Sequence, residues 1–460
     1  MTHSAFGTRL AVASSRDYYS TSASLDRLAR AMDWHDGAAP FGKVLAPGSR
    51  VLIKPNMVLH ENEDPRFGME ELVTHASLIR AAAEAALQSE IAELVIGYAP
   101  IQSCDFQVLL EKTGLGTWAE ELRTRDSRFQ GIRDFRRTTC VLVNGVRVAD
   151  EQLRPIEQFV LFDLAKESLL EPVTSDLANF RVTWYDPRLM ARAHMRGVHQ
   201  YLVAREIIDA DVLINLPKLK THKKAGVTCA LKNLIGINGN KEYLPHHRLG
   251  GSANGGDCYP GSSSVKRALE YVADRQNLTS SYAAAFIYRC LTFALTRFGR
   301  LTKVDRLGVE GSWSGNDTIW RTCLDLNRIL LYGRADATLS DTIQRRVLHI
   351  ADGITAGQGN GPLSPEPLAL GLLLASDNAA VMDWAAAGLL GYDPLLIPIV
   401  CEAFGRFRWP ISAGNPDEIL VSGDCSGTVE DLIEKYHVAV RHPIGWIDSV
   451  RSPEPAAVAR

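Results

Sequence analysis

Residues 213–239, LINLPKLKTHKKAGVTCALKNLIGING, hold the densest group of side chains in the chain that could do chemistry. The segment begins as an apolar strand and then gathers lysine, histidine, threonine and asparagine residues around Gly226. Positive charges held between buried elements need a counter-ion, and an anionic ligand supplies one. The sequence therefore predicts a site for a carboxylate or a phosphate, with candidate residues Lys218, Lys220, His222, Thr228, Lys232 and Asn233.

Two histidines are candidates for proton transfer, because an imidazole changes its charge near neutral pH. His222 lies within the lysine-rich run, and His246 precedes a glycine-rich loop at 248–264. Lys218 and Lys220 are two residues apart, which places both on one side of a continuing strand. We predict that these four residues are catalytic, with the lysines stabilising negative charge on the substrate.

Substrate binding is expected to use a second strand end as well. Lys54 and Asn56 follow the apolar run of a predicted strand at 50–58, so they should emerge at the edge of a sheet. Thr228 and Lys232 are four residues apart and would share one face of a helix that begins near residue 226. The free amides of that helix would add donors for an anion, and Asn233 lies next to them.

Two groups farther along the chain bear on substrate and metal binding. Gly359 and Gly361 lie in a turn whose backbone could approach a ligand closely, so we assign them to the substrate site. Asp352, which precedes that turn, could hold a divalent cation together with Asp257 and His247. The alternative for Asp352 is a carboxylate that caps the turn by accepting backbone hydrogen bonds.

The pattern of apolar residues predicts an α/β fold, with a mainly parallel sheet, helices on both faces, and inserted α+β or helical segments. Thr74 is the expected N-cap of the first helix, and Asn144–Gly145 the turn of a hairpin. The predicted strands are at 50–58, 92–98, 210–216 and 418–421; the predicted helices are at 75–87, 105–113, 227–235 and 378–390; the hairpin is at 141–149; and a loop is expected at 353–365.

The same pattern divides the chain. The predicted parts are 1–120, the first α/β half of the core; 121–205, an inserted antiparallel or irregular subdomain; 206–245, a core strand with the lysine-rich site; 246–345, a glycine-rich loop and helical insertion; 346–450, the second α/β half; and 451–460, a disordered tail.

Composition limits the classes of function. The 460 residues carry a net charge of −3, which disfavours a broad basic surface for nucleic acid. None of the eight cysteines is in a C-x-x-C pair, so neither an iron–sulfur cluster nor a zinc ribbon is expected. Dispersed cysteines and a polar N-terminus without an apolar signal core favour a cytoplasmic protein.

The segment most similar to a membrane-spanning helix is residues 282–300, YAAAFIYRCLTFALTRFGR. No apolar stretch of the sequence reaches the eighteen residues that such a helix needs. One interpretation is an amphipathic helix packed on the core. The other is a helix on a membrane surface, with Arg289, Arg297, Arg300 and Lys303 near the headgroups.

Residues 313–328, WSGNDTIWRTCLDLNR, combine aromatic and charged side chains at helical spacing. Asp317 with Arg321 and Asp325 with Arg328 have the i,i+4 and i,i+3 spacing of ion pairs on a helix. The rival interpretation is an aromatic platform that binds a sugar or another anion.

Several of these strings resemble the family catalogued as domain of unknown function 362 (DUF362), in a long form without a ferredoxin module. They are VLIKPN at 51–56, VTHASLI at 73–79, ADVLINLPKLKTHKKAGVTCALKNLIGI at 210–237, the turn at 352–362 and DNAAVMDWAAAGLLGYDP at 377–394. The resemblance implies an α/β fold with a polar centre at Lys54, Asn56, His75, Lys218, Lys220, His222, Lys232, Asn233 and Asp352. It also implies metal or iron–sulfur relatives, whose cysteine-rich module this sequence does not show.

The leading hypothesis is an enzyme that acts on an anionic small molecule, with lysine, histidine and aspartate side chains at strand ends and a divalent metal as an option. Loss of one such lysine is predicted to lower the rate about 10²-fold. The alternatives are a non-catalytic ligand-binding or accessory protein of a biosynthetic pathway, and an enzyme of lipid-linked substrates at the membrane surface. The reaction, the cofactor and the oligomeric state stay open.

Overall fold

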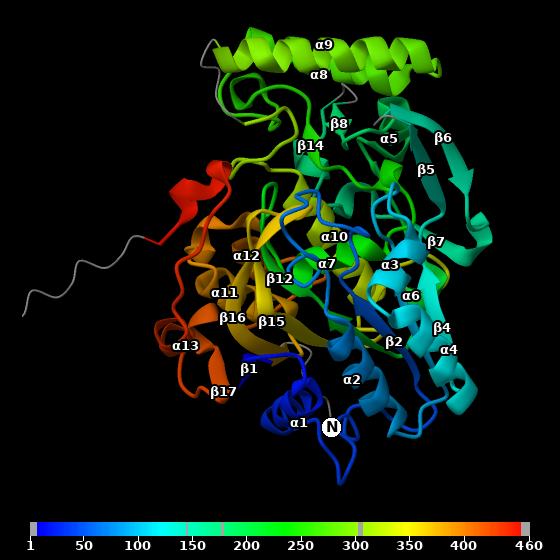
Figure 1. Cartoon of the computed structure of the whole chain (residues 1–460), viewed down its shortest axis with the longest axis vertical. Helices are drawn as coiled ribbons and strands as arrows, with labels where there is room; N and C mark the ends of the chain where they lie inside the picture. The colour runs from blue at the N-terminus through cyan, green and yellow to red at the C-terminus, as the bar shows by residue number, and fades with distance from the viewer. Residues whose placement is uncertain (1–6, 144–145, 176–178, 302–306, 452–460) are drawn as a thin grey trace, which may run out of the picture.

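The computed structural model describes residues 7–143, 146–175, 179–301 and 307–451. Its centre is a mixed, mostly parallel sheet of ten strands (Figure 1). Eight of them follow the order β17 (Leu420–Gly423), β1 (Arg9–Ser14), β16 (Ser364–Ser376), β15 (Arg346–Asn360), β11 (Val212–Leu216), β2 (Arg50–Pro55), β3 (Glu93–Tyr98) and β4 (Phe129–Asp134), while β12 (Lys218–His222) and β13 (Gly226–Thr228) extend from β15.

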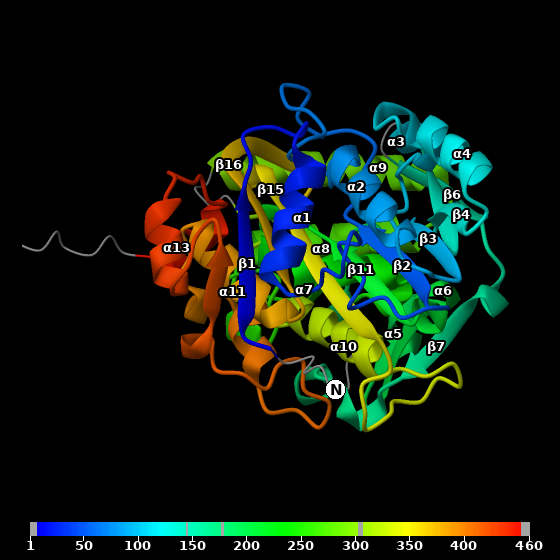
Figure 2. The same ribbon diagram turned by 90° about the horizontal axis from the view of Figure 1, so that it is seen from below.

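Alternating side chains on the strands build a core on each face of the sheet. On β2, Val51 and Ile53 enter one core cluster, whereas Leu52 between them enters another. The first face is covered by α1 (Thr21–Ala31), α2 (Ala76–Leu87), α3 (Phe106–Lys112) and α4 (Leu115–Arg125). The second is covered by α10 (Ile319–Tyr332), α11 (Ala379–Leu389) and a small sheet of β7 (Phe159–Asp163), β9 (His194–Met195) and β10 (Val198–Ala204) (Figure 2). The predicted α/β fold is confirmed.

Most predicted elements are present with shifted ends. β2, β3, β11 and β17 are the predicted strands, and α2, α3 and α11 are the predicted helices. The N-cap of α2 is His75 rather than Thr74, because the Nδ1 of His75 accepts the Ser77 amide. The Thr74 hydroxyl instead donates to the carbonyl of Leu216 at 2.6 Å, which joins the segment before α2 to β11.

The predicted loop at 353–365 is wrong. This segment belongs to β15 and β16, which pair antiparallel along most of their lengths. The glycines do not end the strand; they let another strand come close. A Cβ placed on Gly357 would lie 2.7 Å from the Cβ of Lys220 on β12.

The middle of the chain carries small antiparallel pairs and a helical hairpin. β5 (Thr138–Val143) and β6 (Val146–Gln152) form the predicted hairpin, whose turn at 144–145 lies outside the described residues, as does the tail at 452–460. β8 (Phe180–Arg181) pairs with β14 (His247–Arg248). α8 (Ser264–Leu278) and α9 (Tyr282–Leu301) lie together across one end of the molecule (Figure 1). The division into the six parts stays a prediction.

Candidate functional site

The carboxyl ends of β2 and β11 lie side by side, with Lys54 opposite Asn215 in the parallel register. The chain leaves β11 at Pro217, forms β12 and β13, and then enters the short helix α7 (Ala230–Asn233). This path brings Lys232 into electrostatic range of both Lys54 and Lys220, as expected for polar groups at adjacent strand ends.

Three lysines in this region are buried without an acidic partner. Among the described residues, Lys54, Lys220 and Lys232 form no ion pair within 4.0 Å of a carboxylate. Burial lowers the pKa of Lys54 and Lys220 well below the usual lysine value, and the neighbouring charge of Lys232 lowers it further. Burial also lowers the pKa of Lys232. The site therefore gathers three buried amines whose charged form a bound anion would stabilise.

The three amines differ in how they are held. Lys220 donates to the carbonyl oxygens of Leu72 at 2.6 Å and Pro362 at 3.1 Å, so it ties two loops together. Lys54 lies 4.2 Å from the centre of the Tyr98 ring, a cation–π contact. Within the described part of the chain, the Lys232 amine has no hydrogen-bond or ion-pair partner, which makes it the amine most available to a ligand.

His222 presents a hydrogen-bond donor. Its Nδ1 accepts the backbone amides of Lys224 at 3.0 Å and Ala225 at 3.1 Å, so that atom has no proton and Nε2 carries it. Burial lowers the pKa of His222 well below its usual value, and the charge of Lys232 adds to the effect. The ring is therefore neutral at pH 7.

His246 presents the opposite tautomer. Its Nδ1 lies 2.7 Å from the carbonyl oxygen of Leu244, which can only accept, so Nδ1 carries the proton and Nε2 has a free lone pair. Burial and the charges of Lys224 and Lys232 hold the pKa of His246 well below its usual value. His222 and His246 are within electrostatic range of each other. They thus pair a donor with an acceptor, and we call them, with Lys54, Lys220, Lys224 and Lys232, the lysine–histidine cluster.

Thr228 faces the same cluster from a strand and not from a helix, so the predicted shared helix face with Lys232 is wrong. It lies directly opposite Lys220 in the antiparallel pair of β12 and β13, which brings the two side chains together. Its hydroxyl is buried and makes no hydrogen bond within the described ranges. It is a donor that a ligand could use.

The amides at the start of α7 are not available to an anion, contrary to the prediction. Asp383 on α11 accepts both, from Ala230 at 2.7 Å and Leu231 at 3.2 Å. Burial raises the pKa of this carboxyl to about 7, and the two amides oppose that shift. Asp383 therefore positions the helix that carries Lys232.

Lys218 and Asp352, predicted as a catalytic lysine and a metal ligand, instead bind each other. Their ion pair spans 2.7 Å, and both side chains are fully shielded from solvent. The amine also donates to the Tyr18 hydroxyl at 3.1 Å and the Thr355 carbonyl at 3.0 Å, which uses its three protons. The pair fixes β12 to β15, and a catalytic role for Lys218 stays a prediction.

Asn56 and Asn233 belong to a chain of amide hydrogen bonds beneath the cluster. Asn56 donates to Asn233 at 3.1 Å, and Asn233 donates to Asn215 at 2.7 Å. Asn215 continues the chain to His349 at 3.0 Å. These bonds join β2, β11, α7 and β15, although the Oδ1 of Asn56 remains buried without a partner among the described residues.

Gly359 and Gly361 support the site from outside. The carbonyl of Gly359 accepts the Thr221 hydroxyl at 2.9 Å, and Gly361 accepts the Lys223 amide at 3.0 Å. A Cβ on Gly361 would lie 2.0 Å from the Thr221 carbonyl oxygen. The turn between β15 and β16 thus packs on the backbone of β12.

The donor set does not fit a metal ion. In the ranges that the structure describes, no group of three or more His, Cys, Asp or Glu side chains is arranged to hold one. Asp257 accepts the Thr318 hydroxyl and lies 3.7 Å from Arg248, in a network separate from that of Asp352. The structure therefore does not join Asp352, Asp257 and His247 into a site.

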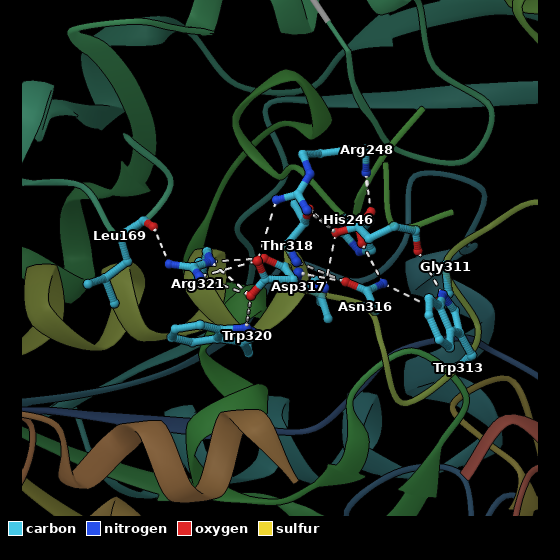
Figure 3. A network of polar contacts seen from close by, with 12 residues as sticks. Leu169, His246, Arg248, Gly311, Trp313, Asn316, Asp317, Thr318, Trp320 and Arg321 are labelled. Atoms are coloured by element: carbon cyan, nitrogen blue, oxygen red, sulfur yellow. Dashed lines mark hydrogen bonds and ion pairs between the residues drawn. The ribbon is translucent and has the colours of Figure 1, made fainter. Parts of the chain in front are cut away.

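A network from the inserted segment positions His246 (Figure 3). Asn316 donates to the carbonyls of His246 at 2.9 Å and Gly311 at 2.8 Å. Asp317 beside it binds Arg321 at 3.0 Å and Trp320 at 2.9 Å. The predicted helical ion pair of Asp317 with Arg321 is confirmed.

The second predicted pair, Asp325 with Arg328, is also confirmed at 2.8 Å. Asp325 further accepts the hydroxyls of Ser168 and Tyr201, all within the protein. These contacts all lie within the protein, and the aromatic platform for a sugar stays a hypothesis.

Some residues of the site carry no sequence signal for their roles. Tyr18 and Asp383 come from distant parts of the chain and meet the lysine-rich segment only in the folded protein. Lys224 lies in the run, yet its assignment needs the contact with Thr183 at 3.1 Å.

One family model and one curated relative match this chain. Residues 162–388 match the family model described as "Domain of unknown function (DUF362)". The thylakoid-associated protein sll1697 of Synechocystis is 26% identical over 261 residues, which cover 55% of either chain. This chain thus spans about half the length of that curated relative.

Two solved structures resemble this chain at a low level of similarity. A Thermotoga maritima protein from a structural genomics consortium is 11% identical with a TM-score of 0.32, over 76% of this chain and 54% of that one. The lactate racemase apoprotein of Thermoanaerobacterium thermosaccharolyticum is 12% identical with a TM-score of 0.32, over 83% and 56%. Likenesses at this level do not bear on function.

Proposed function

This chain carries a domain of the DUF362 family at residues 162–388, and we propose that the protein is an enzyme that moves a proton on an anionic small molecule. The observation that carries the proposal is the amine of Lys232, buried beside two other lysines that also lack acidic partners. A carboxylate or a phosphate group bound there would neutralise them.

The two histidines suit a proton transfer at such a ligand. The Nε2 of His246 would accept a proton from the bound molecule and become an imidazolium. The Nε2–H of His222 would donate a hydrogen bond to the negative charge that develops. The lysines nearby would stabilise the same charge, and the histidine pKa values keep both rings neutral beforehand.

The substrate class follows from the donors. Thr228 lies opposite Lys220, and Lys232 is within electrostatic range of Lys220; these two amines and the free Thr228 hydroxyl would suit the oxygens of a carboxylate or phosphate. The eight cysteines are all free thiols, as expected in a reducing compartment, and we propose that the protein works in the cytoplasm.

The test measures the exchange of carbon-bound hydrogen in candidate substrates with solvent deuterium. The protein is incubated in D₂O with a panel of 2-hydroxy acids, dicarboxylates and sugar phosphates, and NMR follows replacement of carbon-bound hydrogen by deuterium. We expect exchange for the compounds that also raise the thermal unfolding temperature. Stabilisation without exchange would favour the alternative, a non-catalytic binding or accessory protein. No stabilisation by any anion would overturn the proposal.

The remaining alternative is an enzyme of lipid-linked substrates. It requires a surface of the protein that meets a membrane, in addition to the lysine–histidine cluster. Among the described residues, none of the helices is long and apolar enough to cross a membrane. This alternative therefore depends on peripheral contact.

A further inference from the structure

The helix α9 lies on the outside of the molecule. It packs on α8 and touches β6, and it runs across the end of the protein opposite α1 (Figure 1). Its 20 residues span about 30 Å at the rise of an α-helix. The interpretation of this segment as an amphipathic helix packed on the core holds only in part, because α9 packs on α8 and β6 and contributes no described residue to the core clusters.

The outward face of α9 is apolar. Phe293 is 65% exposed, Ile287 59% and Phe286 44%. At 100° per residue, the exposed positions cover about half of the helix circumference, which is a continuous face. The exposed apolar members are Tyr282, Ala283, Phe286, Ile287, Cys290, Leu291, Phe293 and Ala294.

Among the residues of α9 whose burial is described, the inward face carries fewer large apolar side chains than the outward face. Thr292 and Thr296 are turned toward the protein, and their hydroxyls donate to backbone carbonyls one turn earlier, of Tyr288 and Thr292. Ala285 and Gly299 are buried in the part of α9 whose side chains the structure describes. A helix that packs only on its own protein would place its large apolar side chains inward. The reversed arrangement indicates that the outer face meets an apolar phase.

Neighbouring elements extend the apolar surface. Tyr271 of α8 is exposed, and so are Val141 and Val143 of β5, whose partner strand β6 contacts α9. We call α9 with these three residues the α9 face.

The charges of α9 identify that partner. The helix contains no aspartate or glutamate, and its exposed side carries Arg289 and Arg297 among the apolar residues. A second copy of the protein would bring arginine-bearing helices together without acidic partners. Anionic lipid headgroups would instead neutralise the arginines, while the aromatic side chains enter the boundary of the acyl chains.

We propose that the α9 face docks the protein on an anionic lipid surface, with α9 lying flat in the headgroup region. The proposal does not depend on the function of the lysine–histidine cluster. It accounts for both the apolar residues on the outside and the absence of acidic residues in the helix.

The test is sedimentation of the full chain with vesicles. We expect binding to phosphatidylcholine vesicles that contain phosphatidylglycerol, and much weaker binding to phosphatidylcholine alone. Phe286→Ser with Phe293→Ser should lower the partition coefficient at least tenfold. Arg289→Gln with Arg297→Gln should lower it roughly fivefold per arginine. The control is Leu395→Ser with Leu396→Ser, two exposed leucines elsewhere on the surface, which should bind like the unchanged protein.

A second measurement needs no change to the large side chains of the face. The exposed thiol of Cys290 is labelled with an environment-sensitive dye in a Cys140→Ser, Cys401→Ser background, and anionic vesicles should shift its emission to the blue. No sedimentation with anionic vesicles, or no dye shift, would overturn the proposal. So would a dimer in light scattering that dissociates in the phenylalanine variant without any vesicle binding.

Discussion

Lys218 and Asp352 form an ion pair of 2.7 Å that is closed to solvent on every side. The carboxylate also accepts the Tyr18 hydroxyl at 3.0 Å and the His75 amide at 2.9 Å. Four separate segments of the chain therefore meet at one buried charge pair. The pair holds β12 in place, and β12 carries Lys220 and His222 into the site.

Lys218→Met is expected to lower the free energy of unfolding by about 3–5 kcal/mol, because it leaves a buried carboxylate without its counter-ion. Urea denaturation measures the change. The double variant Lys218→Met, Asp352→Asn should cost less than the sum of the single variants. A loss below about 1 kcal/mol for Lys218→Met would contradict this role.

Lys232→Met should raise the thermal unfolding temperature of the protein without ligand, since a buried unpaired amine is removed. It should also abolish the stabilisation that phosphate or a carboxylate gives to the unchanged protein. Lys223→Met is the matched control, because Lys223 is a partly exposed lysine in the nearby turn between β12 and β13. Equal anion stabilisation in both variants would place the anion elsewhere.

Anion affinity is expected to fall as the pH rises. The pKa values of Lys54 and Lys220 lie well below the usual lysine value, mainly because of burial, so these amines lose their protons at lower pH than exposed lysines. A bound anion favours the protonated amines and should therefore raise those pKa values. Titration calorimetry in buffers of different ionisation enthalpy should show proton uptake on binding. Affinity that does not change with pH would argue against these lysines as anion ligands.

His246→Gln should remove hydrogen exchange and leave anion binding within a few-fold, because only the base is lost. A general base contributes typically 10²–10⁴-fold to the rate. His222→Gln keeps a side-chain hydrogen-bond donor, so the deuterium exchange rate of this variant should fall less than that of His246→Gln. The deuterium exchange rate and the thermal shift measure the two effects separately. Equal losses in the two variants would reject the assignment of base and donor.

Asp383→Asn should change how stability depends on pH. The pKa of Asp383 is raised from 3.8 to about 7 in the folded protein, so the native state holds a proton that the unfolded chain releases. Stability of the unchanged protein should therefore fall as the pH rises from about 4 to about 7, by at most about 1.4 kcal/mol per pH unit. The asparagine variant lacks this contribution. The measurement compares how the free energy of unfolding of the two proteins changes with pH. The same change in both proteins would contradict the raised pKa of Asp383.

The elements of the core were predictable from the sequence. Strands such as β2 and β11 are short apolar runs bounded by turns, and α2 has helical spacing over several turns, so local side-chain preferences suffice. The lysine-rich run was also visible, because charges next to an apolar strand stand out. Its membership in an anion site stays a prediction.

The roles of individual lysines were not predictable. Lys218 and Lys220 are two residues apart and alike in sequence, yet one meets the carboxylate of Asp352 and the other meets two carbonyl oxygens. The helix near residue 226 seemed to offer free amides, and Asp383, about 150 residues later in the chain, accepts them. Counter-ions from distant segments decide which charges are satisfied.

The sequence by itself determined that this protein has an α/β core and a concentration of positive charge at residues 218–232. Only the tertiary structure decided that Lys54, Lys220 and Lys232 lack acidic partners among the described residues, and that α9 turns its apolar side outward. The physical reason is that periodicity reports only that a helix has an apolar side. Burial and pairing depend on what the rest of the chain places against each residue.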